Sequence, residues 1–177
     1  MLKKSIAVLL ALCAVCCCLL PAAAASDFGV IRVKLNSNIA GLTEKDAEKL
    51  IELKSDNVVY RADHGGPVLI SDYAGTPESG KLKAGRTYFV NYVMAPAPGY
   101  TLPEKLEKGD VEIECGKGVS VISTSIVTGS YRQDNGEFLQ IRGVKIYAQV
   151  VVDGNAFQRI FGYLHDLYLK MRAWSLY

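Results

Sequence analysis

The chain has 177 residues, of which half are hydrophobic, with 20 Lys and Arg against 18 Asp and Glu. Lys3 and Lys4 account for the whole net charge of +2, so the rest of the chain is electrically balanced. A balanced chain of this length predicts one globular domain and no nucleic-acid partner, because it lacks the excess of basic residues that attracts phosphates.

Residues 1–25 have the pattern of a secretory signal peptide. Lys3 and Lys4 are followed by an apolar run from Ile6 to Leu20, and small residues after Pro21 predict cleavage before Ser26. We therefore expect a secreted, extracellular protein, either free or associated with the cell surface. Lipid attachment at a signal cysteine remains an alternative, although the residues before Cys13 and Cys17 fit it poorly.

Four of the five cysteines lie within this segment, which leaves Cys115 alone in residues 26–177. An exported chain with one cysteine forms no internal disulfide, so its stability must come from packing and sheet hydrogen bonds.

Strand patterns follow the signal. Ile31, Val33 and Leu35 alternate with polar residues, which predicts a half-buried strand. A short amphipathic helix is expected over 43–54, with Thr43 as N-cap and Asp46 three residues later. Further strands are predicted at 57–62, 67–72, 86–95, 110–115, 119–127 and 137–152, the last with an optional break at Gly143. About seven strands between Gly- and Pro-rich turns predict two packed antiparallel sheets.

The alternation also assigns faces. In the last strand the inward face consists of Val144, Ile146, Ala148, Val150 and Val152. Tyr88 and Tyr92 share a predicted core face with Val90 and Met94. Cys115 follows Val111 and Ile113 in phase, which predicts a buried thiol. Tyr147 and Tyr131 are surface candidates for a glycan-binding or protein-binding patch.

The stretch from Gly80 to Gly118 resembles a recurring pattern in Ig-like β-sandwich modules of secreted and cell-surface proteins of Gram-positive bacteria. Ala84, Gly85 and Tyr88 open its long strand, Ala97, Gly99 and Tyr100 mark the exit, and Val111, Ile113 and Gly116 hold the later strand and its turn. This resemblance implies an all-β, Ig-like antiparallel β-sandwich at 26–154 and a bacterial surface setting. It implies no shared catalytic residues.

After Gly154 the apolar period changes from two residues to 3.6, which predicts an amphipathic helix over 155–177. Its stripe of candidate membrane-contacting or partner-contacting residues comprises Phe157, Ile160, Phe161, Leu164, Leu167, Tyr168, Met171 and Trp174. Three interpretations stay open. The stripe docks on the sandwich or on another copy, or it enters a membrane interface with Arg159, Lys170 and Arg172 near the head groups, or the segment is disordered or recruits a different protein.

No constellation of catalytic or metal-binding residues is evident. His64 and His165 are too isolated for a zinc site, and Asp110, Glu112 and Glu114 are explained by the solvent face of a strand. The turn CGKG at 115–118 predicts a tight hairpin. We therefore expect neither an enzyme nor a cofactor, but a secreted non-catalytic module that binds protein, glycan or a membrane surface. A homo-oligomer assembled through the terminal helix is the alternative, and an unrecognised hydrolase is less favoured.

Overall fold

The computed structural model describes residues 28–60, 68–132, 136 and 138–174. The predicted signal peptide at 1–25 and the candidate residue His64 lie outside these described residues.

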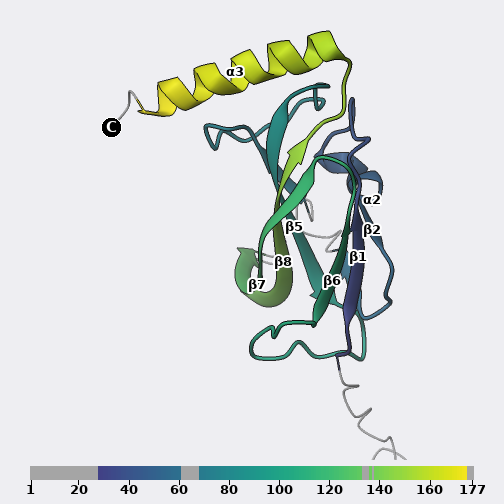
Figure 1. Ribbon diagram of the computed structural model, residues 1–177. Coiled ribbons are helices and arrows are strands. Elements are labelled where there is room, and N and C mark those ends of the chain that lie inside the picture. The colour runs from purple at the N-terminus through teal and green to yellow at the C-terminus, as the bar shows by residue number, and fades with distance from the viewer. Residues whose placement is uncertain (1–27, 61–67, 133–135, 137, 175–177) are drawn as a thin grey trace, which may run out of the picture.

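The described chain is rich in strands, which form two sheets (Figure 1). One sheet has the order β2-β1-β6, with β1 at Ile31–Leu35, β2 at Ile51–Leu53 and β6 at Val111–Cys115. The other has the order β3-β5-β8-β7, with β4 also paired to β5; its strands are β3 at Val58–Tyr60, β4 at Val68–Ser71, β5 at Thr87–Pro96, β7 at Val119–Arg132 and β8 at Phe138–Val151. Two sheets were predicted, but the expectation of antiparallel pairing throughout is wrong, because β1 and β6 run parallel.

The core lies between the inward faces of the two sheets. The predicted inward residues of β8 are all buried, as are Ile31, Val33 and Leu35 of β1. Tyr88 and Tyr92 on β5 are buried with them, which confirms their assignment to the core. Eight consecutive pairs, from Thr87↔Val151 to Met94↔Val144, join β5 to β8, so these two long strands form the central framework of their sheet.

The predicted helix over 43–54 is much shorter than expected. A 3-10 turn at Glu44–Asp46 leads into α2 at Ala47–Leu50, and the chain then becomes β2. The predicted N-terminal signal is present, since the Thr43 N–H and hydroxyl both donate to Asp46 Oδ2, at 2.9 and 3.0 Å. The helix ends early because Ile51 pairs with Leu35 and is fully buried there, which outweighs a weak helix propensity.

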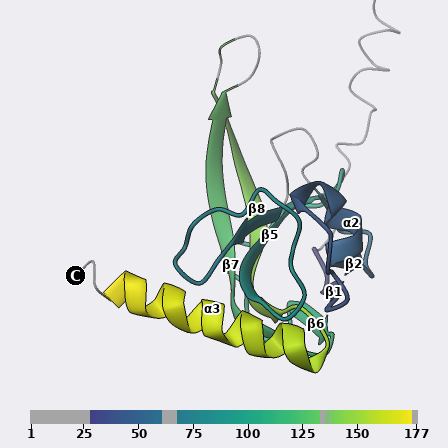
Figure 2. The ribbon, with the colours of Figure 1, turned by 90° about the horizontal axis from the view of Figure 1, so that it is seen from above.

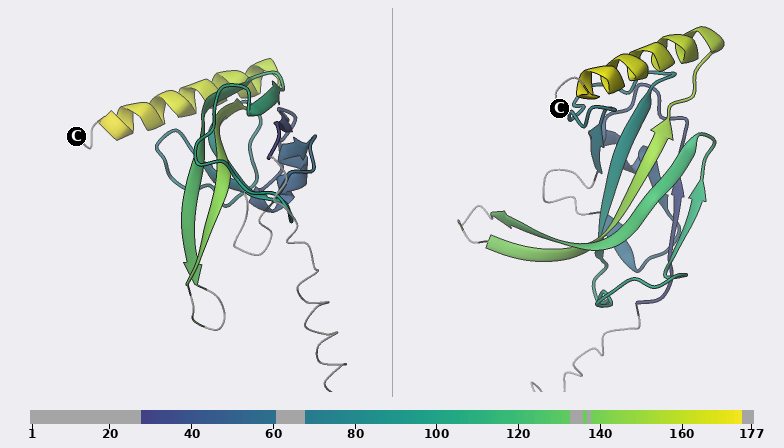
Figure 3. Two further views of the ribbon diagram at one scale, coloured as in Figure 1. Left: turned by 90° about the horizontal axis from the view of Figure 1, so that it is seen from below. Right: turned by 60° about the vertical axis from the view of Figure 1, so that its left-hand side comes forward.

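Two turn predictions also need correction. The Gly116–Gly118 turn carries the chain from β6 in one sheet to β7 in the other, so it is not a hairpin between paired strands. β8 continues unbroken through Gly143, where an added Cβ would lie 2.7 Å from the carbonyl oxygen of Met94. The β7–β8 ladder runs to Arg132↔Phe138 and projects from the body as a long two-stranded arm (Figure 3).

Candidate functional site

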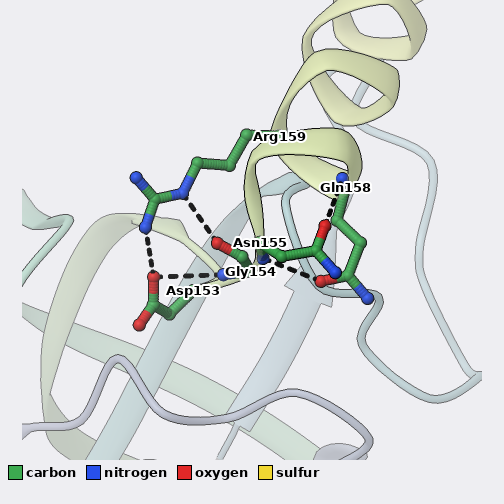
Figure 4. A network of polar contacts seen from close by, with 5 residues as sticks. All are labelled: Asp153, Gly154, Asn155, Gln158 and Arg159. Carbon is green, nitrogen blue, oxygen red and sulfur yellow. Dashed lines mark hydrogen bonds and ion pairs between the residues drawn. The ribbon is translucent and has the colours of Figure 1, made fainter.

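The C-terminal helix, α3 at Ala156–Trp174, confirms the predicted change of period and begins directly beyond the end of β8. Asn155 caps it: the Gln158 N–H donates to Asn155 Oδ1 and the Asn155 N–H donates to Gln158 Oε1, both at 2.9 Å (Figure 4). This reciprocal pair satisfies two backbone donors at a helix start, so the first turn is held in a defined direction.

An ion pair ties the same turn to the end of the strand. Arg159 donates from Nε to the Gly154 carbonyl and from Nη2 to Asp153 Oδ1, each at 2.8 Å (Figure 4). Asp153 also accepts from the Gly154 N–H at 3.0 Å. The hydrogen bond from Arg159, followed by the one from Gly154, holds the pKa of the Asp153 carboxyl below its usual value.

Three glycines bring α3 against the loop before β5. A Cβ on Gly162 would lie 1.9 Å from the Gly85 carbonyl oxygen, and one on Gly85 would lie 2.2 Å from the Gln158 carbonyl oxygen. Gly154 approaches the Gly85 nitrogen in the same way, at 2.9 Å from its added Cβ. Gly85 also has φ +81°, which disfavours a side chain. The start of α3 therefore packs on the body backbone to backbone.

Farther along, α3 contacts the body through a narrow face. Gly162, Asp166 and Leu169 are its buried residues, and they define what we call the docking face. Lys170 Nζ lies 4.2 Å from the ring centre of Tyr73, in a loop that follows β4. Tyr73 in turn packs edge-on against Phe89, at 5.2 Å between ring centres. The second half of the helix is thus supported from one side.

The eight predicted stripe residues, hereafter the apolar stripe, lie on the opposite side of α3. Leu164 in the stripe and Asp166 in the docking face are two residues apart, a rotation of about 200°. Every stripe residue is exposed, from 40 % for Leu167 to 87 % for Trp174. The interpretation that the stripe docks on its own sandwich is therefore wrong, because the helix docks through its other face.

The charges of α3 are distributed unevenly. Asp166 is its single acidic residue, and it is buried at 8 % exposure. Arg159, Lys170 and Arg172 are exposed and lie to either side of the stripe. Tyr163, which was not among the predicted stripe residues, is 67 % exposed and adds a further aromatic ring at the edge of the stripe. The exposed part of α3 is therefore apolar and cationic, without an exposed carboxylate.

The other sequence candidates are dispersed. Glu112 pairs with Arg32 at 2.7 Å and Glu114 with Lys34 at 3.5 Å, so these carboxylates form cross-strand ion pairs on a solvent-facing surface. The Asp110 carboxylate accepts the Glu107 N–H at 2.6 Å in a local turn. His165 is half-buried on α3.

The expectation that Cys115 is buried is wrong, since its thiol is exposed. It is the last residue of β6, at the edge of the smaller sheet, and the core does not extend over the strand end. Alternation identified its face correctly but carries no information about where the opposite layer stops.

The surface candidates Tyr147 and Tyr131 differ in outcome. Tyr147 is half-buried on the outer face of the larger sheet, where its ring lies 6.0 Å from that of Phe89. Tyr131 lies on β7, and its side chain falls outside what the structure describes.

A shallow groove of about 350 Å³ lies where the end of β5 meets the base of the projecting arm. Tyr100, Leu102, Gln140 and Arg142 contribute to its walls. Arg142 Nη2 is already engaged by the carbonyl oxygens of Pro103 and Glu104, at 3.0 and 3.2 Å. Among the described residues, no group of three or more His, Cys, Asp or Glu side chains is arranged to hold a metal ion.

No protein-family model, curated protein or solved structure matches the chain. Within the described ranges, no helix has the length and apolar character needed to cross a membrane.

Proposed function

We propose that this protein is an exported, non-catalytic module that lays the apolar stripe of α3 on an anionic lipid bilayer, with an Ig-like sandwich as its scaffold. The observation that carries the proposal is the combination of a helix fixed to the body and a fully exposed apolar stripe. Large contiguous apolar patches are rare on the surfaces of monomeric soluble proteins, and where they occur they mark interaction sites.

The geometry suits a flat partner. A helix of 19 residues is about 28 Å long, so the stripe forms an extended line rather than a point contact. α3 lies across one end of the sheets, and no other described element rises beyond it on that side (Figure 1). Seen from above, α3 extends past the larger sheet (Figure 2), and the loop that carries Tyr73 supports its second half from the body side. A planar surface can therefore meet the whole stripe at once.

The charge pattern favours a bilayer with anionic head groups. Lys170 and Arg172 flank the stripe, and the buried Asp166 offers no competing negative charge on the helix surface. Arg159 is also exposed, but its charge is paired with Asp153 at the first turn. Amphipathic helices of this composition lie in the plane of the membrane interface, with apolar residues among the acyl chains and basic residues near the phosphates. Trp174, Tyr163 and Tyr168 add the aromatic residues that prefer this boundary.

The export and Ig-like parts of the proposal have separate support. The signal-like pattern of residues 1–25 supports export. The two sheets around one core support an Ig-like architecture, as does the behaviour of the positions that carry the resemblance: Tyr88 is buried, and Gly85 and Gly99 adopt positive φ. A scaffold of this kind needs no catalytic residues, because its role is to hold α3.

The test uses Trp174, the single tryptophan of the sequence, as an internal probe. Protein secreted by a host cell is titrated with vesicles of phosphatidylcholine alone or with phosphatidylglycerol added. We expect a blue shift of tryptophan emission and co-sedimentation with the anionic vesicles, both weakened by salt. Phe161→Ser with Leu164→Ser removes two half-exposed apolar side chains, about 2–3 kcal/mol of burial, and should weaken binding roughly 30- to 150-fold.

The matched control is Leu69→Ser on β4, because Leu69 is 55 % exposed but lies away from α3. This variant should bind vesicles as the unmodified protein does. Equal binding by the α3 variant, or no binding to either vesicle, contradicts the proposal. Light scattering without lipid, compared between the unmodified protein and the Phe161→Ser, Leu164→Ser variant, tests the alternative of a homo-oligomer formed through the stripe, since that oligomer should dissociate in the variant. That assembly would bring the cations flanking two stripes together, which is why the bilayer is preferred.

A further inference from the structure

β7 forms one edge of the larger sheet over 14 residues. Its pairing within the described chain is with β8 alone. A register shift between Val121 and Ser123 marks a bulge, and from Ser123 onward the pairing is regular as the strand enters the projecting arm (Figure 3). One side of this strand therefore presents backbone donors and acceptors outward over a long, regular stretch.

The alternation of sheet hydrogen bonds identifies those outward groups. The Val151 N–H donates toward β7, to the Gly118 carbonyl, whereas Val152 bonds toward the β5 side through Arg86 and Gly85. Odd-numbered residues of β8 thus direct their backbone groups to β7. Because Ser123 pairs with Tyr147 and Ser125 with Lys145, the intervening Thr124 directs its backbone away from β8, and Ile126 and Thr128 do the same.

The chemistry of this edge differs from that of the other described edges. Natural edge strands are protected by charge, proline, bulges or short length, and the bulge of β7 lies before Ser123. β6 carries Glu112 and Glu114, β2 and β3 have three residues each, and β4 has four. By contrast, residues 119–131 contain no charged residue and no proline. Within the described sheets, β7 from Ser123 onward is thus a long edge that lacks these forms of protection.

We propose that β7 pairs antiparallel with β7 of a second copy, through Ser123 to Gly129, and so joins two of the larger sheets across a two-fold axis. The composition of β7 indicates that its partner is a second copy of the same strand. A neutral strand meets its own copy without charge repulsion, and its hydroxyl and β-branched side chains are the types that stabilise cross-strand pairs. The arm extends away from the body, so a second copy can approach this edge (Figure 2).

The experiment measures the mass of the secreted protein by sedimentation across a dilution series, without lipid. Thr124 and Thr128 are exposed and lie on the same face. In the register that pairs Ser123 with Gly129 of the second copy, Ile126 lies on the two-fold axis and Thr124 faces Thr128. Replacing both by Lys should raise the dimer Kd at least about tenfold, because like charges meet across the two-fold axis. Replacing both by Glu should do the same. An equimolar mixture of the Lys and Glu variants should recover the dimer.

Recovery in the mixture excludes misfolding as the cause, since a misfolded strand does not regain its partner. Ser79→Lys with Thr101→Lys adds the same charge at exposed loop positions and should leave the dimer unchanged. A protein that is monomeric at every concentration overturns the proposal. So does a dimer that ignores the β7 charges but dissociates when Phe161 and Leu164 become Ser, since that result assigns self-association to α3.

Discussion

Replacing Gly162 by Ala sets two opposing effects against each other. In a helix interior, Gly→Ala ordinarily stabilises by about 1 kcal/mol, because alanine loses less conformational freedom on folding. At this position the added methyl would lie 1.9 Å from the Gly85 carbonyl oxygen, 2.5 Å from its carbon and 3.1 Å from the Arg86 nitrogen. Ordinary contact begins near 3.4 Å, so α3 or the loop must move by about 1.5 Å.

Such overpacking costs about 1–3 kcal/mol, and the upper end applies here because the obstructing atoms are backbone. We expect a net loss of about 1–2 kcal/mol and a fall in melting temperature of roughly 3–8 °C, measured by calorimetry. The amides of α3 should exchange faster with solvent hydrogen, because the contact between α3 and the loop at Gly85 is weakened. The control is Gly129→Ala, where no atom lies within 4 Å of the added Cβ. Measured in protein dilute enough that the proposed β7 pairing does not contribute, it should show no fall. A Gly162→Ala protein that melts at or above the original temperature would refute the backbone contact.

Two further outcomes follow from groups near α3 and β6. The pKa of Asp153 is lowered by Arg159, so its contribution to holding the first turn of α3 is present at neutral pH and is lost as the pH falls through the folded-state pKa, below about pH 4. The protection factors of the amides in that turn should fall over this range, and Arg159→Gln should weaken the dependence, because only the Gly154 N–H then donates to Asp153. The Cys115 thiol should react with an aromatic disulfide reagent in the native protein about as fast as in the denatured chain, since it is exposed; strong protection would contradict this placement.

Features set by side-chain period were predictable from sequence. The strands that begin at Ile31, Val68 and Thr87 follow alternation and bury their inward residues, and β8 does the same from Val144 onward. β6 alternates as well, but its inward Val111 and Ile113 are only partly buried. α3 follows its 3.6-residue period over nearly its whole predicted length. These patterns reflect local backbone geometry, which a short window of sequence contains.

Features set by distant partners were not predictable. The helix after Thr43 stops at Leu50 because Ile51 pairs with Leu35, sixteen residues earlier. The turn at Gly116 joins two sheets because β6 pairs with β1, a contact across eighty residues. The exposure of Cys115 depends on where the other layer ends. None of these partners can be identified from a short window of sequence. Periodicity alone therefore predicts a longer helix, a hairpin turn and a buried thiol.

The docking side of α3 is the most instructive of these cases. An apolar stripe on a helix beside a sandwich ordinarily predicts burial of that stripe. Turning α3 by half a rotation would achieve it, but would replace Gly162 at the Gly85 carbonyl by a large residue such as Leu164. Since even a methyl does not fit there, the close backbone contact selects the orientation that leaves the stripe outside. A small residue on the opposite side of an apolar helix is thus the sequence signal that was available.

Because α3 docks through its other face, the free energy that burial of the apolar stripe would contribute is not gained within the monomer. Eight large apolar side chains are each about half exposed or more, and covering each would contribute about 1 kcal/mol, for a total of roughly 8 kcal/mol before the cost of association. Three sets of contacts oppose the rotation of α3 that would bury these residues internally: the cap at Asn155, the Asp153–Arg159 ion pair, and the close backbone contacts at Gly85, Gly154 and Gly162. The same contacts that stabilise the position of α3 therefore keep its apolar stripe available to an external surface, and they should be needed for vesicle binding even though none of them touches lipid.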